Sequence, residues 1–342
     1  MIPPNVPSWE PHLWREELAR AYRSPAELLS DLGLPASDEP DIPFAMRVPR
    51  PFASKMQKGN PDDPLLRQVL PLSSELEQTP GFSHDPLQEK FATITSNLIQ
   101  KYEGRALLIT TPACAVHCRY CFRRHFPYDA HRPHTLNSAL AQLAQDHSIR
   151  EIILSGGDPL ILTDDALAKL FEDINAMTYI KRLRIHTRLP IVLPQRISRQ
   201  CLEMLSKPHA QVVIVVHCNH PQELDTDTRD ALKALRKSGL TVLNQAVLLR
   251  GVNDHATIQA ELSEQLFASG VLPYYLHLPD EIQGTAHFFV DEVTGRSIYT
   301  EMQAQLPGYL LPRLVKEVAG HTSKRLIATQ SQSPLTDPPS PK

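Results

Sequence analysis

The chain has 342 residues, 42% of them hydrophobic and 21% charged, and a formal net charge of −3 at pH 7. This composition is that of a globular protein with a sizeable core, and the evenly spread charge provides no basic surface for nucleic acid. The start MIPPNVPSWEP lacks a secretion signal and no stretch approaches the ~18 apolar residues of a membrane span, so we expect a cytoplasmic protein without membrane contact.

Residues 1–100 predict a mostly helical, partly irregular extension. The stretch WEPHLWREELARAYRSPAELLSDLG gives two short amphipathic helices, and Ser24-Pro25 separates them because proline favours the first turn of a helix. The next stretch, MRVPRPFASKMQKGNPDDPLLRQVLP, is rich in Pro, Asn and Asp and predicts turns with short helical pieces.

From residue 105 onward, apolar runs alternate with helical patterns. The runs RALLITT, EIILSGG, IKRLRIHT, QVVIVVHC, LTVLNQAVLL and LPYYLHLP begin near positions 105, 151, 180, 211, 240 and 272. Strand, helix and strand at this spacing predict βαβ units and a parallel sheet. Six such units indicate an α/β fold with a partial (β/α)6-type TIM barrel over residues 101–290. A Rossmann-type sheet is the alternative, although no G-x-G-x-x-G follows a strand.

Unusual residues gather at one end of the predicted barrel. Cysteines follow the first strand, SGGDP, HTR, HCNH and HLPD end the second, third, fourth and sixth, and Asn244 and Gln245 lie in the fifth. In β/α barrels the loops after the strands carry the chemistry, so we expect the active site there. Residues 291–328 form a C-terminal segment, and the polar, proline-rich residues 329–342 predict a disordered tail.

Three of the five cysteines, Cys114, Cys118 and Cys121, lie within eight residues. In a reducing compartment such a cluster is more often a metal or redox site than a set of disulfides. The spacing C-x3-C-x2-C is too compact for two zinc half-sites. An iron–sulfur cluster held by only three cysteines would keep one iron open for a substrate or cofactor.

The remaining cysteines and the nearby histidines leave a second interpretation open. A structural zinc site would use His117 or His125 as a fourth ligand beside the three cysteines. Cys201 and Cys218 lie far along the chain, and we expect them to be small buried residues rather than ligands.

The cysteine motif resembles that of the radical S-adenosylmethionine (radical SAM) enzymes. The stretches CRYCFRRHF, SGGDPL, LRIHTRLPIVLPQRI, NHPQEL, LNQAVLLRGVND, PYYLHLPD and GYLLPRLVKEVAGHTSK together resemble the lysine 2,3-aminomutases, from Lys101 to Lys324. This resemblance implies an isomerase that converts L-α-lysine to β-lysine with a 4Fe-4S cluster, S-adenosylmethionine (SAM) and pyridoxal 5′-phosphate (PLP). The short chain and the stretch NPDDPLLRQVLP are most similar to the bacterial enzymes that supply β-lysine for modification of elongation factor P.

The resemblance assigns PLP to basic residues at both ends of the matched region. Lys324 would bind PLP through a Schiff base, although only Gly320 remains of the several glycines that precede this lysine in the better-known members. Lys101 and Arg105 would hold the PLP phosphate. Lys101 stands where the family has arginine. An arginine can make a two-point contact with the phosphate, whereas the lysine ammonium would act as a point charge.

The resemblance also assigns the substrate contacts. Arg123 would bind the substrate carboxylate through its guanidinium fork, while the adjacent Arg124 is a candidate for a purely structural role. Asp280 and Glu317 would surround the distal ammonium of lysine. Glu317 replaces the aspartate usual at that position and reaches one methylene further.

The cluster and SAM take the remaining positions implied by the resemblance. Cys114, Cys118 and Cys121 would ligate the cluster, and its open iron would bind SAM. The expected SAM contacts are Ser155, Gly156, Gly157, Asp158, His217 and Gln245. The plain alternative for the SGGDP stretch is a tight turn whose glycines adopt positive φ. The plain alternative for His217 is a core histidine whose hydrogen bonds are made within the protein.

Two other functions stay open from the sequence. One is a radical SAM enzyme of different chemistry, acting on peptide or RNA without PLP, with Lys324 incidental. The other is a zinc-stapled binding protein. Either radical SAM function implies an electron donor such as flavodoxin or ferredoxin.

Overall fold

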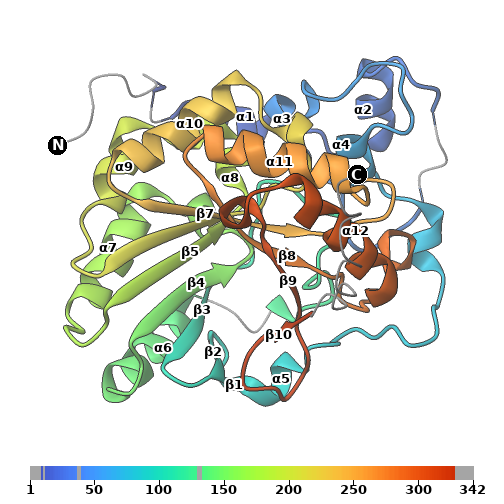
Figure 1. Ribbon diagram of the computed structural model, residues 1–342. Helices are drawn as coiled ribbons and strands as arrows, with labels where there is room; N and C mark the ends of the chain where they lie inside the picture. The colour runs from blue at the N-terminus through green and yellow to red at the C-terminus, as the bar shows by residue number, and fades with distance from the viewer. Residues whose placement is uncertain (1–8, 11, 37–39, 129–132, 328–342) are drawn as a thin grey trace, which may run out of the picture.

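The protein is described by a computed structural model over residues 9–10, 12–36, 40–128 and 133–327 (Figure 1). The tail predicted to be disordered, 329–342, lies outside the described residues. No helix in the described part of the chain is long and apolar enough to cross a membrane.

A ten-stranded sheet forms the centre of the molecule, and its spatial strand order follows the sequence order. Six neighbouring strands pair in parallel. They are β3 (Arg105–Thr111), β4 (Glu151–Gly156), β5 (Arg182–Thr187), β6 (Gln211–Val216), β7 (Thr241–Val247) and β8 (Leu272–His277). Each begins within two residues of its predicted start, which confirms the partial-barrel prediction. The Rossmann alternative is wrong, because the strand order never reverses.

Four further strands extend this parallel core at its two edges. β9 (Arg313–Lys316) pairs in parallel with β8, and β10 (Arg325–Leu326) pairs with β9 in antiparallel fashion. At the other edge, β1 (Thr93–Thr95) and β2 (Leu98–Tyr102) add two antiparallel strands. β2 therefore crosses the boundary expected at residue 100 between the extension and the barrel. The boundary expected between the barrel, 101–290, and the C-terminal segment, 291–328, stays a prediction.

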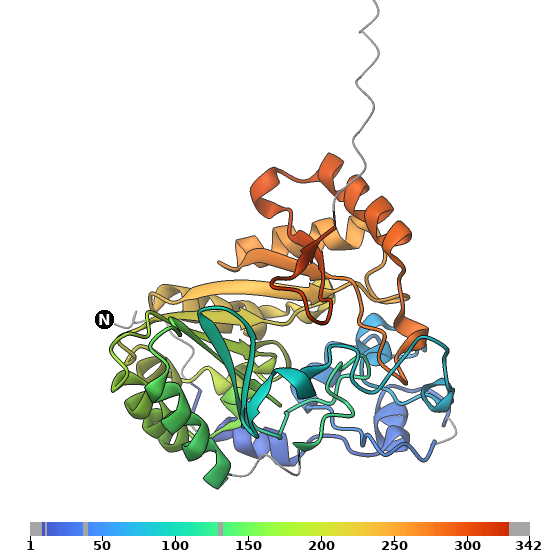
Figure 2. The same cartoon turned by 90° about the horizontal axis from the view of Figure 1, so that it is seen from below.

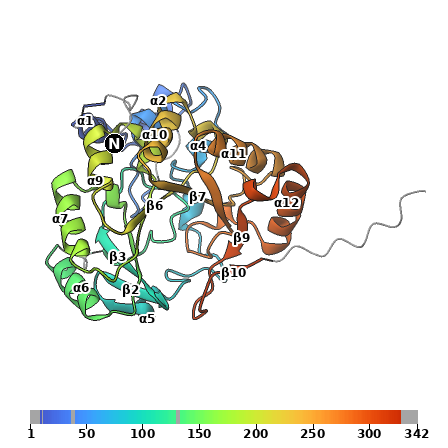
Figure 3. The ribbon, with the colours of Figure 1, turned by 60° about the vertical axis from the view of Figure 1, so that its left-hand side comes forward.

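The helices that connect the parallel strands lie on the outer side of the curved sheet, as Figures 2 and 3 show. They are α6 (Pro133–Gln145), α7 (Asp164–Asn175), α9 (Arg199–Leu205), α10 (Thr226–Lys237), α11 (Ala256–Ala268) and α12 (Glu292–Gln305), with the short α8 (Leu189–Val192) before α9. In α7, Thr163 caps the first turn and the apolar face that includes Leu167 and Phe171 is buried. The strands, covered on their outer face, are correspondingly apolar, as in β6, QVVIVV.

The extension before the barrel is built from short helices and turns. These are α1 (Leu13–Ala19), α2 (Pro25–Asp31), α3 (Arg50–Ala53), α4 (Pro64–Arg67) and α5 (Glu89–Ala92). Ser24 caps α2 by accepting a hydrogen bond from the Glu27 N–H, so the predicted break at Ser24-Pro25 is confirmed. Lys55 Nζ donates to the carbonyl oxygens of Ile191 in α8 and of Glu223 after β6, which ties the extension to the barrel. The extension is thus positioned beside the ends of the parallel strands.

Candidate active site

A cavity of about 800 Å³ lies at the carboxyl ends of the parallel strands. Its wall includes every residue that the sequence predicts for the site, from Lys101 in β2 to Lys324 just before β10. A cavity of this size falls within the ~300–1,000 Å³ typical of small-molecule sites. The structure therefore brings the predicted residues together, and their individual contacts show what each can do.

The loop after β3 presents Cys114, Cys118 and Cys121 to the cavity as free thiols. The preceding extension holds this loop by its main chain. Arg47 Nη1 donates to the Cys114 carbonyl at 3.0 Å, and the Gln68 carbonyl accepts from the Arg119 N–H at 2.8 Å. The three sulfurs thus come from one loop whose backbone is fixed by segments that are distant in sequence.

The histidines considered as zinc ligands are occupied by main-chain contacts. His117 Nδ1 lies 2.8 Å from the Ala45 carbonyl, and His125 Nε2 lies 2.9 Å from that of Gln283. Among the described residues, no three His, Cys, Asp or Glu side chains are arranged to hold a single metal ion. Backbone contacts, rather than a shared ion, therefore account for the orientation of both rings.

Five charges of alternating sign connect the cysteine loop to the C-terminal lysine. Arg123 makes a two-point contact with Glu89, in which Nε and Nη2 are each 2.9 Å from a carboxylate oxygen. Lys101 Nζ lies 3.1 Å from Glu89 and 2.9 Å from Glu317. The other oxygen of Glu317 accepts from Lys324 Nζ at 2.6 Å. This charge chain is continuous along the cavity wall.

The two carboxylates of the charge chain are held ionised by their cationic neighbours. Burial alone would raise the pKa of Glu89, but Arg123 and Lys101 outweigh it and lower that pKa to about 2. Burial likewise opposes the ionisation of Glu317, and Lys324 with Lys101 holds its pKa well below the ordinary value. Both groups therefore act as fixed negative charges near neutral pH.

Asp280, after β8, is in the opposite situation. Its carboxylate has no hydrogen-bond partner among the residues that the structure describes. Burial, followed by the charge of Glu317, raises the pKa of Asp280 to about 7. Asp280 is thus an open acceptor for a cation, whereas both oxygens of Glu317 are taken by lysines. The two carboxylates expected to share one ammonium are not equivalent.

The basic residues expected at the PLP phosphate also differ. Lys101 is neutralised by two carboxylates, Glu89 and Glu317. The Arg105 guanidinium lies 4.9 Å from the centre of the Tyr102 ring and has no hydrogen bond within the described parts of the chain. Arg105 is therefore the more available partner for a dianion, and Lys101 would have to leave an ion pair to join it.

The SGGDP turn at the end of β4 packs directly on the cysteine loop. Ser155 Oγ accepts from Arg123 Nη1 at 2.8 Å. A Cβ on Gly157 would lie 2.1 Å from the Ala113 carbonyl oxygen, and Gly156 has a φ of +118°. Both glycines are thus required by backbone contact between two loops as well as by their place on the cavity wall.

Asp158, an expected SAM contact, lines the cavity, and its side-chain oxygens are bonded within the protein. One carboxylate oxygen accepts from the Leu160 N–H and the Thr187 hydroxyl, and the other accepts from the Arg188 N–H at 2.7 Å. These bonds join the loop after β4 to the loop after β5. Asp158 therefore positions both loops, because its oxygens are already satisfied.

His186, His217 and His277 line the cavity. His217 Nε2 lies 3.1 Å from His186 Nδ1, and burial lowers the pKa of His217 to about 4. His277 Nε2 is buried without a hydrogen-bond partner among the described residues. Gln245 also lines the cavity, whereas Asn244 bonds both main-chain groups of Cys218 and is structural.

Sequence reasoning missed several residues of this site. Glu89 lies in the irregular lead-in, where no local pattern marks it as the partner of Arg123. Arg188 belongs to HTR, a polar triplet at a strand end, and this position was a usable signal. Arg124 bonds the Arg119 and Gly284 carbonyls and Glu75, which agrees with a structural role.

Comparison with known proteins decides the family. Residues 108–260 match the family model described as the Radical SAM superfamily. An L-lysine 2,3-aminomutase from Escherichia coli is 46% identical over 95% of this chain and 97% of its own length, and one from Haemophilus influenzae is 45% identical over 92% and 95%. The chain belongs to the L-lysine 2,3-aminomutase family. A radical SAM methyltransferase from Sphaerobacter thermophilus aligns with 64% of this chain and 68% of its own at 16% identity and a TM-score of 0.42.

Membership of this family implies a 4Fe-4S cluster, SAM and PLP as cofactors, and the residues present fit them. Three thiols on one loop suit a cluster with an open iron. Lys324 offers an amine, and Arg105 offers a guanidinium for a phosphate. The buried Nε2 of His277 and the carboxylate of Asp280 are polar groups that a bound ligand could satisfy.

Proposed function

We propose that the protein is an isomerase that converts L-α-lysine to β-lysine in a radical reaction dependent on SAM and PLP. Relatives of up to 46% identity that are named L-lysine 2,3-aminomutase support this substrate and reaction. The observation that carries the proposal is a single cavity lined by the three cysteines together with Lys324 and Asp280.

The chain's own residues would bind and orient the substrate. When bound, the cluster and SAM supply a carbon radical and PLP supplies the π-system that carries the migrating nitrogen. Glu89 and Ser155 fix Arg123, whose Nη1 and Nη2 each keep one N–H that no described residue accepts and that a substrate carboxylate could. Asp280 would receive the distal ammonium, and Glu317 would add a second negative charge nearby.

The charges favour a dibasic amino acid. A buried ammonium without a counter-charge costs several kcal/mol, so a site that binds one must present an acid. Asp280 supplies an unpaired carboxylate for this purpose. A substrate with a carboxylate at that end, such as glutamate, would instead meet Asp280 and Glu317 as like charges.

We further propose a cellular setting for this reaction. β-Lysine would serve the modification of elongation factor P in the cytoplasm, and a flavodoxin or ferredoxin would deliver the electron that reduces the cluster. The stretch NPDDPLLRQVLP supports the elongation factor link through its resemblance to enzymes of that pathway. Mass spectrometry of elongation factor P from a strain that lacks the gene would test it, and an unchanged mass would contradict it.

Anaerobic reconstitution tests the core proposal. The protein would be loaded with iron, sulfide and PLP, mixed with SAM and a reductant, and incubated with L-lysine. We expect β-lysine and 5′-deoxyadenosine in the wild type and in Cys201→Ala, and neither product in Cys118→Ala. Formation of 5′-deoxyadenosine without β-lysine would point to a radical SAM enzyme of different chemistry. A colourless protein without iron would point to the zinc-stapled alternative.

A further inference from the structure

Arg188 lies against one of the three cysteines in the loop after β3. Its Nη1 is 2.7 Å from Cys118 Sγ and directs an N–H at that sulfur. The arginine is 5% exposed, and its guanidinium also lies 5.5 Å from the centre of the Tyr120 ring. The guanidinium of Arg188, which is buried and always positively charged, therefore donates a hydrogen bond to the sulfur of Cys118.

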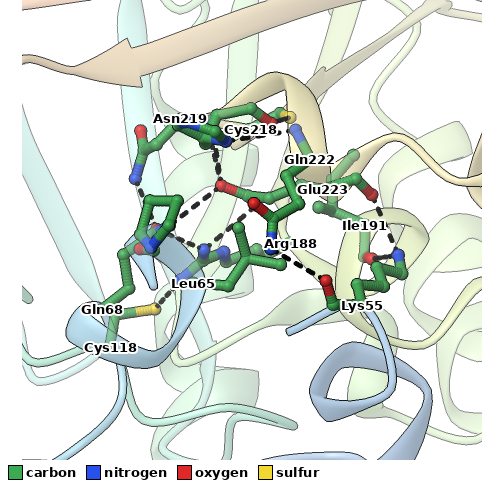
Figure 4. Close-up of polar contacts among 12 residues, drawn as sticks. Lys55, Leu65, Gln68, Cys118, Arg188, Ile191, Cys218, Asn219, Gln222 and Glu223 are labelled. Atoms are coloured by element: carbon green, nitrogen blue, oxygen red, sulfur yellow. Dashed lines mark hydrogen bonds and ion pairs between the residues drawn. The ribbon is translucent and has the colours of Figure 1, made fainter. Parts of the chain in front are cut away.

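Two residues hold the guanidinium in this orientation, as Figure 4 shows. Arg188 Nη2 donates to the side-chain oxygen of Gln68 at 2.6 Å and to Glu223 Oε2 at 3.1 Å. Gln68 Nε2 in turn donates to the other oxygen of Glu223 at 3.2 Å. With Nη2 fixed by two acceptors, Nη1 has little freedom to turn away from Cys118.

The supports of Arg188 come from separate parts of the chain. Gln68 follows α4 in the extension, and Glu223 lies in the loop after β6, where its Oε1 also accepts from the Asn219 N–H at 3.0 Å. Lys55 Nζ, which is buried, bonds the Glu223 carbonyl at 2.9 Å. The arrangement is a buried ion pair, and because the desolvation of both charges can outweigh their attraction, stability alone does not account for it.

We propose that Arg188 is a positioning residue that sets the reduction potential of the cluster through its hydrogen bond to the sulfur of Cys118. This inference rests on the proposed function, because it requires a cluster on the three cysteines. Reduction adds one electron from a low-potential one-electron donor and increases the negative charge on the iron and sulfur atoms. A cationic N–H donor at a ligand sulfur stabilises that reduced state and raises the potential.

A redox titration of reconstituted full-length protein, monitored by electron paramagnetic resonance, measures this effect. In Arg188→Met the donor and its charge are lost, so the cluster should be harder to reduce. At the wild-type midpoint, the ratio of reduced to oxidised cluster should fall about tenfold, which is ~59 mV for a one-electron couple. Arg188→Lys, which keeps the buried charge beside Glu223, should shift the potential in the same direction by less and serves if the methionine variant does not fold.

Glu223→Gln separates this role from simple packing. Both Arg188→Met and Glu223→Gln break the same buried ion pair, so both should lower the melting temperature. If Arg188 acted only through packing, the two variants would change the reduction potential of the cluster alike. If Arg188 acts through its hydrogen bond to Cys118, their reduction potentials should differ. Glu223→Gln removes a negative charge and keeps the N–H on Cys118, so its potential should equal or exceed that of the wild type.

Arg196→Met is the matched control for burial. Arg196 is fully buried, donates to the Leu160 carbonyl at 2.7 Å and pairs with Asp164, and it does not line the cavity. Its replacement should reduce stability without moving the potential. An Arg188→Met cluster with the wild-type midpoint would overturn the inference and leave the proposed function intact. A wild type that takes up iron but shows no reducible 4Fe-4S signal would count against the proposed function instead.

Discussion

Glu317 Oε2 lies 2.6 Å from the Nζ of Lys324, so the carboxylate expected to bind the substrate holds the lysine expected to bind PLP. Its other oxygen holds Lys101. Glu317 is thus neutralised by two lysines, whereas Asp280 has no such partner among the described residues. Engaging Lys324 with PLP would remove one cation from Glu317, so the substrate ammonium would meet a freer carboxylate beside Asp280.

The first prediction concerns Lys324 itself. Borohydride reduction of the PLP-loaded protein, followed by peptide mapping, should place the pyridoxyl group on Lys324, because this amine lies in the cavity. Lys316→Ala is the matched control, since Lys316 belongs to the same segment but pairs with Glu281. The label should persist in Lys316→Ala and vanish in Lys324→Ala. A label on any other lysine would refute the assignment.

The second prediction tests the ammonium site. Asp280→Asn should lower kcat/KM for lysine by about two to four orders of magnitude, because it leaves a buried ammonium without its main partner. Cleavage of SAM by dithionite without lysine should change little, since the charged groups around Asp280 are Glu317 and lysines and none of the three cysteines. Glu281→Gln, at the adjacent position, should keep wild-type turnover. Wild-type kcat/KM in Asp280→Asn would rule out this ammonium site.

The third prediction is a pH dependence of lysine binding. Burial and the charge of Glu317 raise the pKa of Asp280 to about 7, so the neutral acid prevails below that pH and the carboxylate above it. A cation binds the carboxylate, so affinity should rise with pH through 7 and weaken about tenfold for each pH unit below it. Equilibrium binding of lysine at several pH values measures this slope. Asp280→Asn should abolish it, and an unchanged slope in that variant would assign the titration to another group.

The fourth prediction concerns stability. Arg123 and Lys101 keep the pKa of Glu89 at about 2, below its ordinary 4.5, against the effect of burial. Because this folded-state pKa is lowered, Glu89 stabilises the fold above pH 4.5, and that contribution is lost as the pH falls towards 2. Glu89→Gln should therefore lower the free energy of unfolding by about 3–5 kcal/mol near neutral pH. It should also make that free energy less dependent on pH in the acid range. Glu103→Gln, at an exposed site, should change stability by less than about 0.5 kcal/mol.

The fifth prediction separates the cysteines. Alanine at Cys114, Cys118 or Cys121 should prevent iron loading and SAM cleavage. Cys201 and Cys218 are fully buried, away from the cavity wall, so alanine at either should spare both. Iron analysis after reconstitution gives the answer. Loss of iron in Cys218→Ala would exclude a cluster that keeps one iron open.

The sequence predicted the parallel strands because each is a local apolar run, such as QVVIVV in β6, and local patterns survive in the fold. The location of the site could be predicted from the topology. Polar segments at the carboxyl ends of parallel strands, such as HTR and HLPD, lie together at one end of a barrel. The pairs that define the charges could not be found this way. Arg123 and Glu89 are 34 residues apart, and Arg188 and Gln68 are 120 apart, with no periodicity to connect them.

The hydrogen-bond and ion-pair partners of individual side chains could not be predicted from the sequence either. Asp158 sits in a motif that resembles a cofactor loop, yet its oxygens bond Thr187 and the backbone around it. Lys101 looks like a free cation in the sequence but bridges two carboxylates. Such roles depend on which neighbours are buried together, and only the folded chain determines that.

Arg188, which contacts Cys118, and the two residues that hold it all lie in the first two thirds of the chain. Gln68, Arg188 and Glu223 all precede residue 224, whereas Lys324 is made about a hundred residues later. At ~5–20 residues per second, the ribosome takes ~5–20 s to cover that distance. During synthesis these three residues are therefore made before the lysine that would receive PLP.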